Sequence, residues 1–332
     1  MSKSPPMPPP GEDPESKGPP SEEANPKSGR RPRPKAGPGP TARPAVTIRT
    51  IKRMALAGEK FSCLTCYDAT TARWLERAGV HILLVGDTAS EMILGFDRTI
   101  DMPLDVLLAL TAAVKRGAPN TMVMGDMPFM SYQADESSAL RNAARFLTEG
   151  RADTVKIEAD ASYAPLVAKM ARAGIPVVAH VGSKPQQAML SGGYASKGRT
   201  AEEAAQVVRD AVALERAGAI MLLVEAVPDE VSAEILARTS VPLIGIGAGV
   251  ACHGQVLVLH DLIGLTDAPP RFASSVASLG AAIEDAGKEW VERVAASRIG
   301  GMRYTMKPGE TQRLREILSS GLAPADSDEK RV

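Results

Sequence analysis

Short runs of consecutive apolar residues recur along the chain, and each follows a segment with helical spacing. Three such segments are similar to one another, namely LERAGVHILLVGD at 75–87, MARAGIPVVAHVG at 170–182 and LERAGAIMLLVEA at 214–226. In each segment a glycine ends a helix, and a short strand follows it. Strands that are apolar throughout are typical of parallel sheets covered on both faces. The repetition therefore predicts an α/β fold.

The same pattern predicts eight strands separated by helices. The strands are expected at 61–66, 82–86, 121–125, 154–158, 176–181, 219–225, 241–246 and 255–259, the last being the weakest. Helices are expected at 69–78, 104–116, 136–149, 161–173, 201–217 and 229–238. About eight strands in a chain of this length favour a closed (β/α)8 TIM barrel. An open doubly wound sheet is the alternative, because the eighth strand is weakly marked.

The two ends of the chain differ from this repeating region. Fourteen of the 26 prolines fall in residues 1–44. Such a segment buries too little apolar surface to offset its ordering entropy, so residues 1–46 are predicted to be a disordered proline-rich leader. Residues 47–308 form the predicted catalytic barrel. Residues 309–332 are predicted to be a polar helix, ETQRLREILSSG, followed by a frayed tail.

Composition and charge exclude several classes of partner. Hydrophobic residues make up 44% of the chain, and 39 basic residues balance 39 acidic ones. Neither a nucleic acid nor a membrane is therefore an expected partner, and no apolar run reaches the roughly 18 residues of a spanning helix. The first residues lack the apolar core of a signal peptide. With three cysteines, of which Cys63 and Cys66 are expected to be inert core thiols, a cytoplasmic location is predicted.

The strand at 154–158 carries two opposite charges on one face. Its sequence, within DTVKIEAD, alternates so that Lys156 and Glu158 point to one face and Val155 and Ile157 to the other. A strand of this kind is otherwise apolar. The two charges therefore need a functional explanation.

Polar residues also stand at the ends of the neighbouring strands. Asp68, Asp87, Asp126, His180 and Glu225 each end or follow a predicted strand. Asp68 is expected to cap the helix that follows it. In α/β folds the carboxyl ends of parallel strands form the active-site face. The other four residues are therefore candidates for a shared site with Lys156 and Glu158.

Asp87, Asp126 and Glu158 suggest a magnesium site, because clustered carboxylates repel one another and supply the oxygen ligands that Mg²⁺ prefers. The alternative is that each acid pairs with an arginine or caps a helix. Lys156 could hold an anionic substrate or act as a Schiff-base nucleophile.

Glu225 follows an apolar run that could tune it as a general base, although it could instead pair with a lysine. His180 could be a ligand, an acid or a hydrogen-bonding core residue, and the last is favoured slightly. The glycine-containing segment 191–200 is predicted to be a mobile lid.

Taken together, several motifs resemble one enzyme family. They are LTCYDATTARWLERAG, LLVGDTAS, KRGAPNTMVMGDMPFMSY, VKIEAD, VVAHVGSKPQ, SGGYASKGR, EAVP and VPLIGIGAG with GQVLVLHD, in that order between about residues 46 and 304. The chain resembles the ketopantoate hydroxymethyltransferases. The resemblance implies a barrel of the phosphoenolpyruvate/pyruvate-binding kind, bound Mg²⁺ and a homo-oligomer, commonly a decamer.

The resemblance also implies an activity and a role for each site residue. The family transfers a hydroxymethyl group from 5,10-methylenetetrahydrofolate to 3-methyl-2-oxobutanoate (2-oxoisovalerate), giving ketopantoate for pantothenate synthesis. Metal ligation is implied for Asp87 and Asp126, and for Glu158 directly or through water. Substrate contacts are implied for Asp87, Thr88, Asp126 and Lys156. Glu225 corresponds to the proton acceptor, and His180 remains a candidate for an accessory role.

Three departures from the family pattern concern substrate preference. Thr88 replaces the usual serine, Arg98 and Asp101 alter the loop at 95–105, and His253 stands where aspartate is common. Two other functions remain open. One is another Mg²⁺-dependent 2-oxoacid aldolase or lyase, although the cysteine loop of isocitrate lyases is missing from the sequence. The other is a homologue that binds 2-oxoacids without turnover.

Overall fold

A computed structural model describes residues 44–321. The predicted leader therefore lies outside the described residues except for its last three positions, and so does the tail after residue 321. The polar helix predicted near the carboxyl terminus is present as α11 (Glu310–Gly321). A helix that the pattern did not predict, α10 (Leu279–Ala295), precedes it.

Eight parallel strands form a closed barrel in chain order, and the last strand pairs with the first to close it. The strands are β1 (Phe61–Thr65), β2 (Ile82–Val85), β3 (Met122–Asp126), β4 (Thr154–Glu158), β5 (Val177–Gly182), β6 (Met221–Glu225), β7 (Leu243–Ile246) and β8 (Gly254–Leu257). The predicted (β/α)8 barrel is confirmed, and the alternative open sheet is wrong. The weakly marked eighth strand is real because β1 and β7 supply hydrogen-bonding partners on both its sides.

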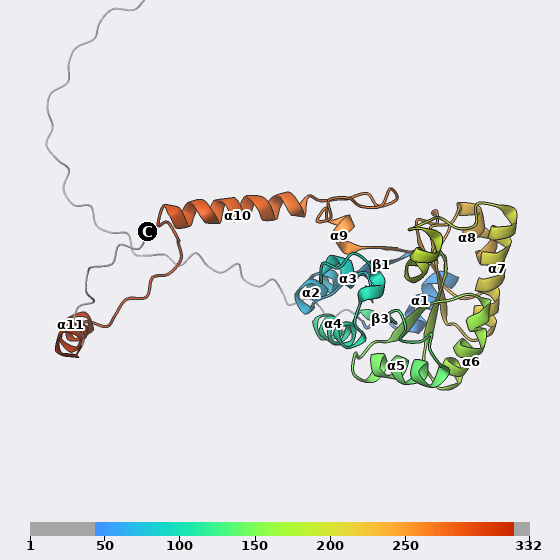
Figure 1. Cartoon of the computed structure of the whole chain (residues 1–332), viewed down its shortest axis with the longest axis horizontal. Helices are drawn as coiled ribbons and strands as arrows, with labels where there is room; N and C mark the ends of the chain where they lie inside the picture. Colours follow the sequence, from blue (N-terminus) through green and yellow to red (C-terminus); the bar gives the residue numbers. More distant parts are fainter. Residues whose placement is uncertain (1–43, 322–332) are drawn as a thin grey trace, which may run out of the picture. The chain divides into compact units, whose positions relative to one another are not determined.

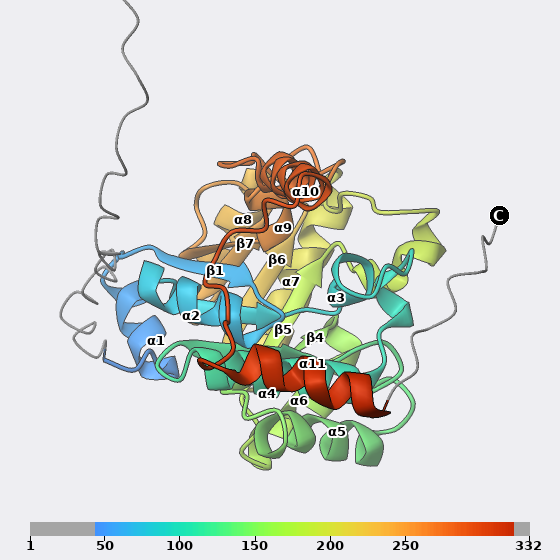
Figure 2. The same ribbon diagram turned by 90° about the vertical axis from the view of Figure 1, so that its left-hand side faces the viewer.

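Helices surround the strands and follow most of them (Figures 1 and 2). They are α2 (Ala69–Ala78), α3 (Ala89–Met92), α4 (Leu104–Gly117), α5 (Glu136–Thr148), α6 (Ala164–Arg172), α7 (Ala201–Arg216), α8 (Asp229–Leu236) and α9 (Leu259–Leu262). Short 3-10 helices lie at η1 (Thr99–Asp101), η2 (Ala161–Tyr163) and η3 (Pro185–Ser191). Asp68 caps α2 as predicted, because its carboxylate accepts hydrogen bonds from the amides of Thr70 and Thr71.

The alternation of side chains along the strands divides the apolar core in two. One cluster fills the barrel interior and includes Met122, Met124, Val178 and Leu223. The other lies between the strands and the helices and includes Val155 and Ile157 of β4. The predicted division of β4 is therefore confirmed, since its apolar face packs on the helices and its charged face points into the barrel.

One unpredicted helix closes the amino-terminal end of the barrel. In α1 (Ile48–Leu56), Ile51 and Met54 are buried in the interior cluster together with Phe61. This end is consequently apolar, and the charged residues at the carboxyl ends of the strands lie at the opposite end. Among the described helices, none is long and apolar enough to cross a membrane.

Candidate active site

The predicted site residues meet at the carboxyl ends of the strands, which we call the barrel mouth. They line one cavity of about 60 Å³. Its lining includes Asp87, Thr88, Asp126, Lys156, Glu158, His180 and Glu225. The lining residues include one lysine and no arginine. The alternative in which each acid pairs with its own arginine is therefore wrong.

Asp87 and Asp126 are joined directly. Both side chains are buried, and the Asp87 amide donates a hydrogen bond of 3.1 Å to Asp126 Oδ2. Glu158 is also buried, but its carboxylate accepts from the backbone amide of Gln186, at 3.1 and 3.3 Å. Within residues 44–321, no three His, Cys, Asp or Glu side chains form a group placed to hold one metal ion. The aspartate pair, rather than all three acids, is thus the compact part of the cluster.

Burial and the charges of neighbouring carboxylates make Asp87 and Glu158 reluctant to ionise. Burial, together with the charge of Asp126, raises the pKa of Asp87 to about 8. Burial also raises the pKa of Glu158 well above its ordinary value, and the nearby Asp87 and Asp126 add to this effect. A site that disfavours its own carboxylate charges is one that a cation would stabilise.

Lys156 is the positive charge of this cluster. Its Nζ lies 2.7 Å from Asp126 Oδ1 and 3.4 Å from His180 Nδ1, and its side chain is only 5% exposed. Burial alone would lower the pKa of Lys156, but the carboxylates of Asp126, Asp87 and Glu158 raise it instead. The side chain is therefore held as an ammonium, which favours an electrostatic role over that of a Schiff-base nucleophile.

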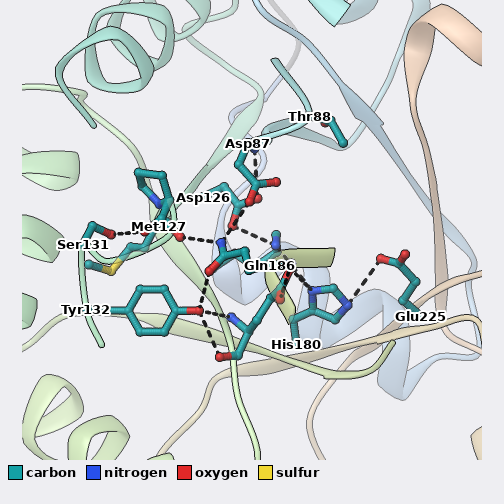
Figure 3. Close-up of polar contacts among 12 residues, drawn as sticks. Asp87, Thr88, Asp126, Met127, Ser131, Tyr132, His180, Gln186 and Glu225 are labelled. Carbon is teal, nitrogen blue, oxygen red and sulfur yellow. Dashed lines mark hydrogen bonds and ion pairs between the residues drawn. The ribbon is translucent and has the colours of Figure 1, made fainter. Parts of the chain in front are cut away.

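Glu225 and His180 occupy the next two strands. Glu225, at the end of β6, has a side chain 19% exposed, whereas the His180 side chain is 2% exposed. The distance from His180 Nε2 to Glu225 Oε2 is 3.4 Å, and Figure 3 shows the two side chains facing each other. Glu225 therefore combines a fixed neighbour with access to the cavity, as a general base requires.

Thr88 retains the hydroxyl of the serine that it replaces. Its Oγ1 lies 2.7 Å from the hydroxyl of Tyr67, a buried residue that follows β1. Thr88 is the residue before α3, and its side chain makes no capping bond to that helix. The hydroxyl is therefore directed by Tyr67 beside the cavity.

Gln186 and Tyr132 are site residues that the sequence pattern did not reveal. Gln186 Nε2 donates to Asp87 Oδ2 at 2.9 Å, while its backbone amide bonds Glu158. The Tyr132 hydroxyl lies 3.0 Å from Gln186 Oε1 and 3.0 Å from the Glu158 carbonyl oxygen, so either oxygen can accept its one proton (Figure 3). Gln186 thus connects two of the acids to each other. The only signal for it was its place in the motif VVAHVGSKPQ.

The other departures from the family pattern do not line the cavity that holds the acids. Arg98 and Asp101 form an exposed ion pair of 2.7 Å around η1, and Arg98 borders a separate hollow of about 310 Å³ beside η3. His253 Nδ1 accepts a hydrogen bond from the Leu243 amide, where β7 begins. His253 therefore lies at the end of the barrel opposite the mouth. We infer that it has no direct role in substrate choice.

The predicted core thiols are confirmed, since Cys63 and Cys66 are buried and neither forms a disulfide. Cys63 belongs to the interior cluster and Cys66 to the outer one, so the two sulfurs lie on opposite faces. Burial raises the pKa of both thiols. Neither is activated for catalysis.

A larger hollow, of about 590 Å³, lies between α7 and α8. Alanine, valine and arginine side chains make up most of its lining, with two glutamates, Glu230 and Glu234. None of the site residues borders it. We assign the site to the smaller cavity because the buried charges converge there.

The chain matches the family model described as ketopantoate hydroxymethyltransferase over residues 45–300. It is 43% identical over 283 residues to the 3-methyl-2-oxobutanoate hydroxymethyltransferase of Hyperthermus butylicus, covering 85% of this chain and 98% of that one. The corresponding protein of Carboxydothermus hydrogenoformans is 41% identical over 272 residues, with 81% and 99% covered.

Solved structures resemble the chain in fold at much lower identity. A phosphonopyruvate hydrolase complexed with oxalate and Mg²⁺ has a TM-score of 0.54 at 13% identity and covers 83% of this chain and 100% of its own. A 2,3-dimethylmalate lyase of the PEP mutase/isocitrate lyase superfamily has a TM-score of 0.51 at 17% identity, with 85% and 100% covered. These likenesses support the barrel architecture.

Proposed function

The chain belongs to the ketopantoate hydroxymethyltransferase family, and we propose that the cavity at its barrel mouth carries out the family's reaction. The reaction joins the one-carbon unit of 5,10-methylenetetrahydrofolate to C3 of 3-methyl-2-oxobutanoate. With one water consumed, the products are ketopantoate and tetrahydrofolate. The observation that carries the assignment is that all seven predicted polar residues line this one cavity.

We propose that Asp87 and Asp126 hold Mg²⁺ and that Glu158 lies one layer further out. The fit rests on the donor set, since three buried carboxylates face a single ammonium, a formal excess of two negative charges. Mg²⁺ usually takes one or two carboxylates and completes its sphere with water and substrate. When bound, the ion would act as a Lewis acid toward the carboxylate and keto oxygens of the 2-oxoacid.

Lys156 and Thr88 are proposed to bind the 2-oxoacid. The Lys156 ammonium, fixed by Asp126, places a positive charge where the substrate's carboxylate enters and where negative charge develops on its keto oxygen. The hydroxyl of Thr88, directed by Tyr67, supplies a neutral hydrogen bond at the same wall of the cavity. Both groups are fixed before substrate arrives, so little ordering is left for the reaction step.

Glu225 is proposed to take the proton from C3. The C3–H bond breaks, its proton moves to the Glu225 carboxylate, and its electron pair remains on the substrate as an enolate. That carbon then bonds to the one-carbon unit of the folate. The two C–N bonds that hold this unit to tetrahydrofolate break, and the water that is consumed supplies the oxygen of the new hydroxymethyl group and the protons of the released amines. Glu225 suits this role because it faces the cavity and lies on a different strand from the proposed metal ligands.

We further propose that the protein is a homo-oligomer. Helix α10 has no buried residue, yet it carries large apolar side chains that are exposed, among them Trp290 (52%) and Val291 (68%). Exposed apolar surface of this kind is typical of association surfaces. Light scattering coupled to size exclusion would give the number of subunits, and a monomer at micromolar concentration would contradict the proposal.

Incubation with 3-methyl-2-oxobutanoate, 5,10-methylenetetrahydrofolate and Mg²⁺ tests the proposed function. We expect ketopantoate to form, EDTA to stop its formation, and added Mg²⁺ to restore it. Glu225→Gln should lower kcat by about 100-fold or more with little change in KM, because general-base catalysis contributes 10²–10⁴-fold. Glu158→Gln should raise the Mg²⁺ concentration needed for half-maximal activity.

Two outcomes would contradict the proposal. Binding of the 2-oxoacid with Mg²⁺ but without turnover would identify a non-catalytic homologue. If Asp87→Asn and Asp126→Asn both left activity and its sensitivity to EDTA unchanged, the metal assignment would be wrong.

A further inference from the structure

His180 lies between the positive charge of the site and its proposed base. Its Nδ1 is 3.4 Å from Lys156 Nζ, and its Nε2 is 3.4 Å from Glu225 Oε2 (Figure 3). Its side chain is 2% exposed, so water has little access to either nitrogen. The ring therefore bridges two functional groups that belong to β4 and β6.

The lysine contact determines which nitrogen of the ring carries the proton. An ammonium has three donors and no acceptor, so a hydrogen bond between Lys156 and His180 requires Nδ1 to accept. In a neutral imidazole the proton must then be on Nε2, which points at Glu225. Burial and the charge of Lys156 lower the pKa of His180, which favours this neutral form.

The Nε2 donor has no hydrogen-bond partner in the structure as it stands. An unpaired buried donor is costly, by about 1–3 kcal/mol. Glu225 Oε2 lies just beyond a good hydrogen bond, and catalytic hydrogen bonds often tighten only when substrate is bound. A small shift of Glu225 would satisfy the donor.

The backbone around this pair is fixed. In the β5–β6 register His180 pairs with Leu223 and Gly182 with Glu225, so both side chains point into the barrel. The Ser183 amide donates to the Glu225 carbonyl oxygen at 2.9 Å. A Cβ on Gly182 would come within 2.5 Å of that oxygen, so only glycine permits this approach. The main chain of Glu225 is therefore fixed in position. The direction in which its carboxylate points depends on the side chains around it.

We propose that His180 is a positioning residue, which donates from Nε2 to Glu225 and so aims that carboxylate at the C3 proton of the substrate. The inference rests on the proposed function and adds a role to a residue that sequence reasoning favoured as part of the core. The groups that face the ring are Asp126 of β3, Lys156 and Glu158 of β4, and Glu225 of β6. A neutral donor suits a general base, because it orients the carboxylate and lowers its basicity less than a cationic donor would.

Two substitutions separate the two nitrogens of the ring. His180→Gln places an amide nitrogen near the former Nε2, so it can keep the donor to Glu225 while losing the Nδ1 acceptor. His180→Asn places its amide near the former Nδ1, so it can keep a partner for Lys156 while losing the donor to Glu225. The two variants are matched in polarity and differ in which neighbour they can reach.

We expect His180→Asn to lower kcat by about 100-fold, since misplacing a catalytic group by about 1 Å can cost that much. Its KM for 3-methyl-2-oxobutanoate should change less than about threefold, and the isotope effect of a C3-deuterated substrate should rise as proton transfer becomes slower. His180→Gln should keep kcat within about tenfold of wild type. Equal losses in the two variants, or wild-type kcat in His180→Asn, would overturn the proposal.

A measurement on the unmodified protein guards against misfolded variants. The chain has four histidines, and ¹⁵N labelling of their rings reports which nitrogen of each is protonated. We expect His180 to be protonated at Nε2 alone, and a proton on Nδ1 would overturn the proposal. If the unmodified protein makes no ketopantoate, the proposed function fails; if it does and the ring carries a proton on Nδ1, only the role of His180 fails.

Discussion

Two lysine–aspartate pairs lie at opposite ends of β4, and their N···O distances are the same. Lys115 Nζ is 2.7 Å from Asp153 Oδ2 just before the strand, and Lys156 Nζ is 2.7 Å from Asp126 Oδ1 near its end. The first pair is partly exposed, with side chains 22% and 35% accessible. The second is buried, with 5% and 2% accessible.

The surroundings of the two pairs differ more than their geometry does. Asp153 also accepts a hydrogen bond from the Val123 amide, and Lys115 also donates one to the Thr121 carbonyl oxygen. The first pair therefore joins strand ends, and both of its charged groups have further hydrogen-bond partners. The second pair has an excess of acid around it, and Asp126 Oδ1 makes an ion pair with Lys156 without a well-formed hydrogen bond. An ion pair that is buried and unbalanced indicates a ligand site, whereas a balanced, wetter pair indicates structure.

Replacing each of the two lysines by methionine is the strongest test of the difference between the two pairs. Lys156→Met should lower the free energy of unfolding by about 3–5 kcal/mol, because it leaves buried carboxylates without their counter-charge. It should also lower kcat by at least about 100-fold, since Lys156 is the proposed electrostatic contact to substrate. The measurements are urea unfolding and the ketopantoate assay.

Lys115→Met is the matched control. It should lower the free energy of unfolding by about 1 kcal/mol or less, because a partly exposed ion pair contributes little to stability. Its kcat should stay within about threefold of wild type. If the two variants lost stability and activity to the same extent, the distinction between the two ends of β4 would be wrong.

Gln186 allows hydrogen bonding at the site to be tested separately from charge, because it bonds two of the acids and is itself neutral. Gln186→Leu removes the donor to Asp87 and the acceptor of Tyr132, so kcat/KM should fall by about tenfold and stability by about 1–3 kcal/mol. Gln133→Leu, which loses one bond to Gln186 from a half-buried position, is the control. An unchanged kcat/KM in Gln186→Leu would show that the acids hold their places without it.

The smallest expected effect concerns Asp68, which ends its strand like the site acids yet caps a helix. Asp68→Ala should cost about 1 kcal/mol of stability and leave activity unchanged. Burial alone would raise the pKa of Asp68, but hydrogen bonds from Thr71 and Thr70 lower it. Its contribution is therefore present above the unfolded pKa and is lost as pH falls through the lowered folded value.

Asp68→Asn separates the charge from the cap. It should retain most of the stability at neutral pH and remove this part of the acid dependence, as thermal unfolding between pH 3 and 7 would show. A loss of activity in either Asp68 variant would contradict its assignment as a structural cap.

The strands were predictable from sequence because parallel strands buried on both faces consist of continuous apolar runs. The alternation of Lys156 and Glu158 with Val155 and Ile157 was equally readable, since a strand has a period of two. Helix α1 was not predicted. Its role depends on Ile51 and Met54 entering the far end of the barrel, which is a long-range contact.

The polar partners of the site were less predictable than its charges. Asp87, Asp126 and Glu225 end apolar strands, where a charge is conspicuous. Gln186 and Tyr132 lie on connecting segments, where polar residues are ordinary, so only their places in the motifs VVAHVGSKPQ and KRGAPNTMVMGDMPFMSY mark them.

The sequence was enough to predict the strands and the charged residues that end them, because both follow from periodicity, and it favoured a closed barrel without excluding an open sheet. Only the tertiary structure showed which of the acids lie in contact and which of them are hydrogen-bonded to Gln186. It also showed which side chains surround His180. The reason is that closing the barrel brings strands from distant parts of the chain within a few ångströms, and local pattern carries no record of those distances.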